Sequence, residues 1–118
     1  MRFFVAGAAM QNAVKTGSID TAMTYLLRAA QLGQRQASAM LGVILEDFPE
    51  DPDYRLKSAF HYQMAVAAGC VDVKKPAADA VARLSTEERA ALDYNLTLWQ
   101  PEIDPRDPQP VPGQCLAG

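Results

Sequence analysis

Residues 22–33 read Ala-Met-Thr-Tyr-Leu-Leu-Arg-Ala-Ala-Gln-Leu-Gly, and residues 59–69 read Ala-Phe-His-Tyr-Gln-Met-Ala-Val-Ala-Ala-Gly. The first alanine and the tyrosine return after 37 residues, and the closing glycine returns after 36. Beyond each glycine the spacing is shared again: Ala37, Leu41 and Gly42 are matched by Val73, Ala77 and Ala78. Recurrence of this kind is typical of a repeat architecture, in which one supersecondary unit is copied along the chain.

Each repeated unit is predicted to be a pair of helices, because its apolar residues recur at intervals of three and four. Small residues at fixed places let the helices approach closely, and the aromatic position occupied by Tyr25 and Tyr62 is expected to fill the core between them. Glycines, prolines and capping residues predict the helix ends. The six expected helices run from the first residues to Gly17, from Ser18 or Asp20 to Gly33, from Gln34 to Asp47, from Asp53 to Gly69, over a short stretch from Lys75, and from Thr86 to Trp99.

Prolines dominate the end of the chain, with five between Pro101 and Pro112. Neither a helix nor a sheet ladder tolerates this density of proline, so the segment is expected to be extended. The predicted organisation is a helical repeat domain over residues 1–99 and a Pro-rich tail over residues 100–118.

The pattern A-x-x-aromatic-x-x-[KR]-A-A-x-x-G-x-x-x-A-x-x-x-L-G resembles the Sel-one-like repeat family, a branch of the tetratricopeptide-like superfamily. The first copy matches the pattern at Ala22, Tyr25, Arg28, Ala29, Ala30, Gly33, Ala37, Leu41 and Gly42. The resemblance implies an all-α fold in which antiparallel helix pairs form a right-handed stack, an α-solenoid of about six helices. It also implies a non-catalytic protein-protein interaction module, an adaptor or scaffold that binds with its concave face. The family supplies no catalytic residue, metal ligand or cofactor.

The partner of such a module is expected to be another protein or a peptide. From helix order alone, the candidate contact residues are Gln11, Gln34, Arg35 and Ser38. The apolar residues 3–5 have no preceding repeat to cover them, so we expect either self-association through that end or shielding by the Pro-rich tail.

Two alternatives stay open at this stage. An inhibitor or immunity-type protein would neutralise one specific effector, since small acidic proteins often block basic sites. A small enzyme or a regulatory subunit of an enzyme would form its site only at an oligomer interface.

Charge and hydropathy exclude some partners. The net charge is -3 at a pI near 5.0, and the basic residues are scattered, which argues against nucleic acid. The apolar run from Phe3 to Met10 is too short to cross a bilayer. A cytoplasmic protein is therefore predicted, with a cleaved signal segment and a secreted or periplasmic location as the alternative.

Four further features have competing interpretations. Cys70 and Cys115 are interpreted as free thiols in a reducing compartment, with a disulfide that pins the tail as the alternative. His61, the only histidine, is predicted to be packed or at the surface, because no second ligand stands at metal-binding spacing. Five carboxylates between Glu46 and Asp53 favour a solvated loop over a site for Ca²⁺ or a basic partner. Trp99 is predicted to seal the core, with an anchor for a partner as the alternative.

Overall fold

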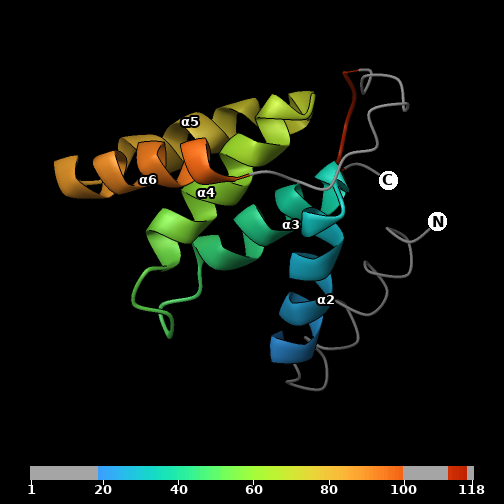
Figure 1. The fold of residues 1–118 in the computed structure, drawn as a ribbon, viewed down its shortest axis with the longest axis horizontal. Coiled ribbons are helices and arrows are strands. Elements are labelled where there is room, and N and C mark those ends of the chain that lie inside the picture. The colour runs from blue at the N-terminus through green and yellow to red at the C-terminus, as the bar shows by residue number, and fades with distance from the viewer. Residues whose placement is uncertain (1–18, 100–111, 117–118) are drawn as a thin grey trace.

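The computed structural model describes residues 19–99 and 112–116, and this part of the chain is all-α, with no β-sheet. The described part of the domain that the sequence predicts to be all-α therefore contains helices joined by turns and loops. Gln11, the apolar residues 3–5 and the helix predicted to end at Gly17 lie outside the described residues. The helices are α2 (Ile19–Gln31), α3 (Arg35–Glu46), α4 (Tyr54–Ala67), the short 3-10 helix η1 (Val71–Val73), α5 (Lys74–Ala82) and α6 (Thr86–Leu98) (Figure 1).

The ends of these helices follow the signals in the sequence. Gly33 and Gly69 have φ angles of 87° and 101°, a left-handed conformation that closes α2 and α4 and that glycine adopts without a Cβ clash. At the start of α6, the Ser85 hydroxyl accepts the Glu88 amide while the Glu88 carboxylate accepts the Ser85 amide, which completes the predicted capping box. Asp53 precedes α4 as predicted, but its side chain makes no capping hydrogen bond.

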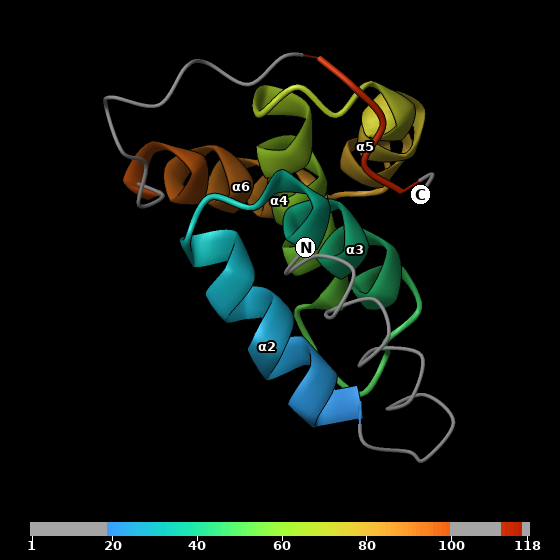
Figure 2. The same cartoon turned by 90° about the vertical axis from the view of Figure 1, so that its right-hand side faces the viewer.

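Short turns make neighbouring helices fold back on one another. Only residues 32–34 separate α2 from α3, so the two helices form a hairpin, and α4 then runs back along α3 (Figures 1 and 2). One group of buried side chains holds α2 against α3; it comprises Leu26, Ala29, Ala30, Ala37, Leu41 and Leu45. The alanines in this group keep the two helices close together, as their fixed places in the repeat predict.

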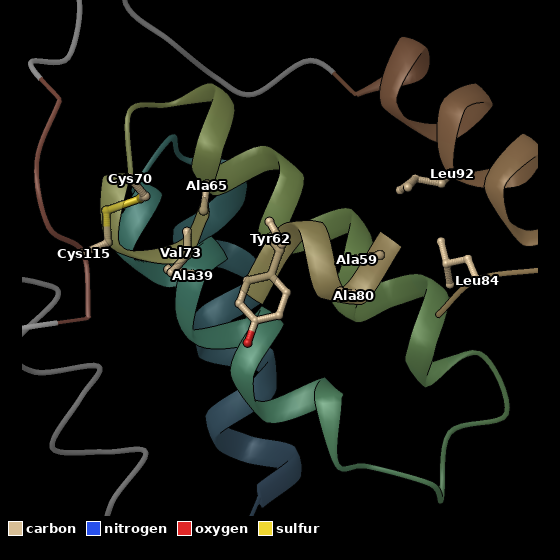
Figure 3. Packing of buried hydrophobic residues seen from close by; sticks show 11 residues of the cluster. Ala39, Ala59, Tyr62, Ala65, Cys70, Val73, Ala80, Leu84, Leu92 and Cys115 are labelled. Atoms are coloured by element: carbon tan, nitrogen blue, oxygen red, sulfur yellow. A yellow bond between two sulfur atoms is a disulfide. The ribbon is translucent and has the colours of Figure 1, made fainter. Parts of the chain in front are cut away.

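A second group of buried side chains joins α3, α4, α5 and α6 (Figure 3). Tyr62 is at its centre and points from α4 toward α3, where it meets Gly42. Leu84, in the turn before α6, and Leu92, in the middle of α6, belong to the same core. The last described helix thus closes the core beyond the second repeat.

The two repeat tyrosines differ in burial, which corrects the prediction that both fill the core. Tyr62 is 1% exposed, whereas Tyr25 is 39% exposed. Tyr62 has the bare backbone of Gly42 on the preceding helix to pack against. The same position in the repeat therefore does not carry the same degree of burial.

Cys70 and Cys115 form a disulfide, so the interpretation as free thiols is wrong. Both residues are almost fully buried, and the bond joins the turn after α4 to the C-terminal segment (Figure 3). Among the described helices, none combines the length and the apolar character needed to traverse a bilayer.

Candidate functional site

A groove of about 390 Å³ lies between the first half of α4 and the end of α6. Its apolar lining consists of Leu56 and Phe60 from α4 and Leu98 and Trp99 from the end of α6. Polar side chains complete the lining; they are Asp53, Lys57 and Asn95. The volume falls in the range of small ligand sites and is large enough for bulky side chains of a partner.

Helical spacing explains why these residues gather. Asp53, just before α4, is four residues from Lys57, and Leu56 is four residues from Phe60, so these residues lie on one side of the helix. On α6 the same rule places Asn95 beside Leu98 and Trp99. Because α4 and α6 contact each other in the core, the two stripes border the same groove.

Phe60 and Trp99 form the apolar floor of this arrangement. Their ring centroids are 5.6 Å apart with an interplanar angle of 81°, an edge-to-face contact that fixes the indole against α4. The indole Nε1 is buried and has no hydrogen-bond partner among the described residues. Trp99 therefore contacts Phe60, which packs against the core, and at the same time lines an open groove.

Next to the floor, His61 is packed inside the protein, which confirms one of its two predicted placements. The residue is 6% exposed and its ring stands edge-to-face on Phe60, with centroids 5.2 Å apart. Burial, with a smaller contribution from the nearby Lys57 charge, lowers the pKa of His61 to about 4. The imidazole is therefore neutral near pH 7 and can neither carry a charge to a ligand nor take part in an ion pair there.

The acidic loop between α3 and α4 borders the Asp53 end of the groove. Asp51 accepts hydrogen bonds from the Lys57 ammonium at 2.6 Å and from the Asp53 amide at 2.8 Å, and these contacts hold the pKa of Asp51 below its ordinary value. Asp47, Glu50 and Asp53 are exposed, and their carboxylates make no hydrogen bond or ion pair with the described part of the chain. The loop thus carries unpaired negative charge at the surface.

Glu46, at the start of the same acidic stretch, has a structural role instead. Its carboxylate accepts a 2.8 Å hydrogen bond from the Tyr62 hydroxyl and lies 3.3 Å from the Arg83 guanidinium. Burial and the Glu46 contact raise the pKa of Tyr62 well above its ordinary value, so the phenol stays protonated and donates. No group of three potential metal ligands is present within residues 19–99 and 112–116.

The contact residues predicted from helix order do not meet on one open surface. Arg35 donates a 3.0 Å hydrogen bond to the Ala68 carbonyl oxygen and so fastens α3 to the end of α4. Ser38 is buried, and Gln34 is half-buried with a side-chain oxygen that has no partner. Gln11 lies outside the described residues; among the three described candidates, Gln34 has a buried side-chain oxygen without a hydrogen-bond partner in the described part of the chain.

The sequence contained a signal for the groove in Trp99, which already had an anchor interpretation. The repeat itself does not predict the groove. Helix α6 lies beyond the second copy, so the spacing of the repeat does not indicate which helix α6 packs against.

Comparison with protein-family models, with curated proteins and with solved structures finds no match in any of the three. The groove must therefore be interpreted from its own chemistry.

Proposed function

We propose that this protein is a non-catalytic protein-protein interaction module, an adaptor or scaffold built from helical repeats of the Sel-one-like kind. The observation that carries the proposal is the groove between α4 and α6, which combines exposed apolar walls with a charged rim. Protein interfaces commonly pair an apolar centre that contains aromatic side chains with a polar rim. The neutral, packed His61 beside the groove is a poor proton-transfer group near pH 7, which favours binding over acid-base catalysis.

A stacked-repeat architecture is part of this proposal. Its support is the close contact of α3 with α4, which puts the second hairpin against the first through Gly42 and Tyr62. In such a stack each repeat buries its apolar face against its neighbours and leaves an extended surface for a partner.

A second candidate within the binding class is an inhibitor or immunity-type protein that neutralises one effector. The exposed carboxylates of Asp47, Glu50 and Asp53 favour it, because a cluster of unpaired negative charge complements a basic active or binding site.

The disulfide bears on the compartment in which the protein works. Disulfides persist in oxidising compartments and are rare in the reducing cytoplasm. We infer a secreted or periplasmic setting, in place of the cytoplasmic one predicted from the sequence, because Cys70 and Cys115 are bonded and buried.

Affinity capture from the native host, under non-reducing conditions, tests the proposed function. We expect one or a few proteins to be retained in stoichiometric amounts and to bind the purified chain again in calorimetry. Activity profiling is the counter-test: turnover by the purified protein that is abolished by His61→Gln, in the absence of any retained partner, would replace the binding module by an enzyme.

A further inference from the structure

We propose that the groove between α4 and α6 receives a partner segment in which a large apolar side chain is flanked by lysine or arginine. This inference deepens the proposed function and rests on it. It names the chemistry of the partner and the part of the surface that binds it.

The expected apolar side chain of the partner follows from the apolar side chains that remain exposed in the folded protein. Leu98, which lines the groove, remains 60% exposed at the end of α6, and Tyr94 one turn earlier is also largely exposed. Leu98 shares the groove with Phe60 and Trp99, and Tyr94 adds exposed apolar area four residues earlier on the same helix. A leucine or phenylalanine of a partner would remove that surface from water, which is the main favourable term in protein association.

The basic half follows from the charges around the same groove. Among the described lining residues the one cation, Lys57, is already bound to Asp51 at 2.6 Å, whereas the Asp53 carboxylate at the same end makes no ion pair with the described residues. Asp47 and Glu50 add exposed negative charge on the adjoining loop. The groove therefore favours a cation beside its apolar ligand and opposes an acidic one.

Charge also decides between a foreign partner and a second copy of the chain. The whole chain carries a net charge of -3, and a second copy would bring the same acidic loop. Like charges brought together at an interface reduce affinity, so a basic partner is favoured over self-association through this groove.

Trp99 gives a direct readout, since it is the only tryptophan in the chain. The probe is a short synthetic peptide with a Leu-Phe pair between lysine and arginine residues and no tryptophan. Its counterpart replaces every basic residue by glutamate. We expect the basic probe to shift the emission of Trp99, and the acidic counterpart to leave it unchanged at the same concentration.

Matched variants locate the binding site. Leu98→Ala is expected to weaken binding of the basic probe about tenfold, which corresponds to the loss of one central apolar contact. Asp53→Asn, which keeps a side chain suited to the residue before a helix, is expected to weaken it about threefold and to reduce its salt dependence. Leu27→Ala on α2 and Asp79→Asn on α5 change an exposed leucine and an exposed aspartate away from the groove and are expected to have no effect.

Equal binding of the acidic and basic probes, or full binding by Leu98→Ala, overturns the proposal. Sedimentation that shows a dimer of the wild type and a monomer of Leu98→Ala also overturns it, because the occupant is then a second copy. A captured native partner that binds the wild type and Leu98→Ala equally well rejects this groove while the protein-binding function stands. If neither a captured partner nor the basic probe binds, both are rejected.

Discussion

The ring of Tyr62 lies so close to Gly42 that a Cβ built on the glycine would be 2.6 Å from the ring carbon Cδ1. Beside this contact, the Ser58 hydroxyl donates a 2.7 Å hydrogen bond to the Gly42 carbonyl oxygen. The backbone of α3 at Gly42 therefore packs directly against the Tyr62 ring of α4, at a distance that only glycine permits. The contact joins the hairpin of α2 and α3 to α4.

Gly42→Ala is expected to destabilise the protein, although alanine is the better helix former. Overpacking against the buried Tyr62 ring outweighs the gain in helix propensity, and we expect a net loss of about 1–2 kcal/mol in the free energy of unfolding. Urea unfolding followed by circular dichroism measures it. The matched control places Gly42→Ala in a Tyr62→Leu background, where the substitution should lower the free energy of unfolding less. If Gly42→Ala alone stabilises the protein, the close contact with Tyr62 is contradicted.

Tyr62→Phe keeps the ring on Gly42 and removes only the hydroxyl that donates to Glu46 at 2.8 Å. Loss of a hydrogen bond to a partly buried carboxylate should lower the free energy of unfolding by about 1–2 kcal/mol. A double-mutant cycle with Glu46→Gln measures the coupling. Purely additive effects of the two substitutions would mean that the hydroxyl and the carboxylate do not interact.

Some of these contacts could be predicted from the sequence, and others could not. Small residues at fixed places in the repeat, such as Gly42, predicted close helix packing. The positive φ angles of Gly33 and Gly69 fit the predicted helix ends. Tyr25 shows the limit of the repeat, because burial depends on the neighbouring helix and not on the position within the unit.

The disulfide and the groove depend on contacts between distant parts of the chain. Cys70 and Cys115 are 45 residues apart, and the sequence alone does not show that the Pro-rich tail returns to the turn after α4. The groove needs α6 to lie against α4, although α6 belongs to neither copy of the repeat. Helical periodicity places residues on a face of one helix but does not say which helix that face meets.

Removing the disulfide with Cys70→Ala and Cys115→Ala together should destabilise the chain. The bond closes a loop of 45 residues, for which the chain-entropy model gives a loss of about 4 kcal/mol in the free energy of unfolding. Unfolding of the double variant and of the wild type, with and without a dithiol reductant, provides the comparison. A wild-type unfolding curve that the reductant leaves unchanged, with thiol titration showing complete reduction, would contradict a stabilising role.

Asp72 binds the same C-terminal segment through hydrogen bonds. Its two carboxylate oxygens accept the amides of Cys115 at 2.9 Å and of Leu116 at 2.8 Å. Asp72→Asn replaces one acceptor by a donor and should lower the free energy of unfolding by about 1–2 kcal/mol, with faster hydrogen exchange at both amides. Asp79→Asn, an exposed change on α5, is the matched control, and unaltered exchange in Asp72→Asn would contradict the contact.

His61 should make the protein less stable in acid. Its pKa is about 4 in the folded protein and about 6.5 when unfolded, so the unfolded chain binds a proton first as the pH falls. Stability is unaffected by this group above pH 6.5 and decreases between pH 6.5 and pH 4, by about 3 kcal/mol in total. We expect His61→Gln to lose that part of the pH dependence in urea unfolding at several pH values.

Comparison of the two pH profiles separates the contribution of His61 from that of carboxylates with lowered pKa values. Asp51 and Glu88 have lowered pKa values, so they also reduce stability in acid, and they do so equally in wild type and variant. The difference between the profiles therefore reports His61. Parallel profiles from pH 7 to pH 4 would mean that the imidazole is not buried in its neutral form.

Stacking of α3 on α4 is the feature on which the proposed repeat architecture depends. Nuclear magnetic resonance tests it most directly, through the Hα protons of Gly42 and the ring protons of Tyr62. We predict strong nuclear Overhauser effects between them and a glycine Hα shifted by the ring current, with both signals retained at pH 7 in the oxidised protein. An unshifted Gly42 Hα without Overhauser effects to the Tyr62 ring would show that α3 and α4 are not packed side by side.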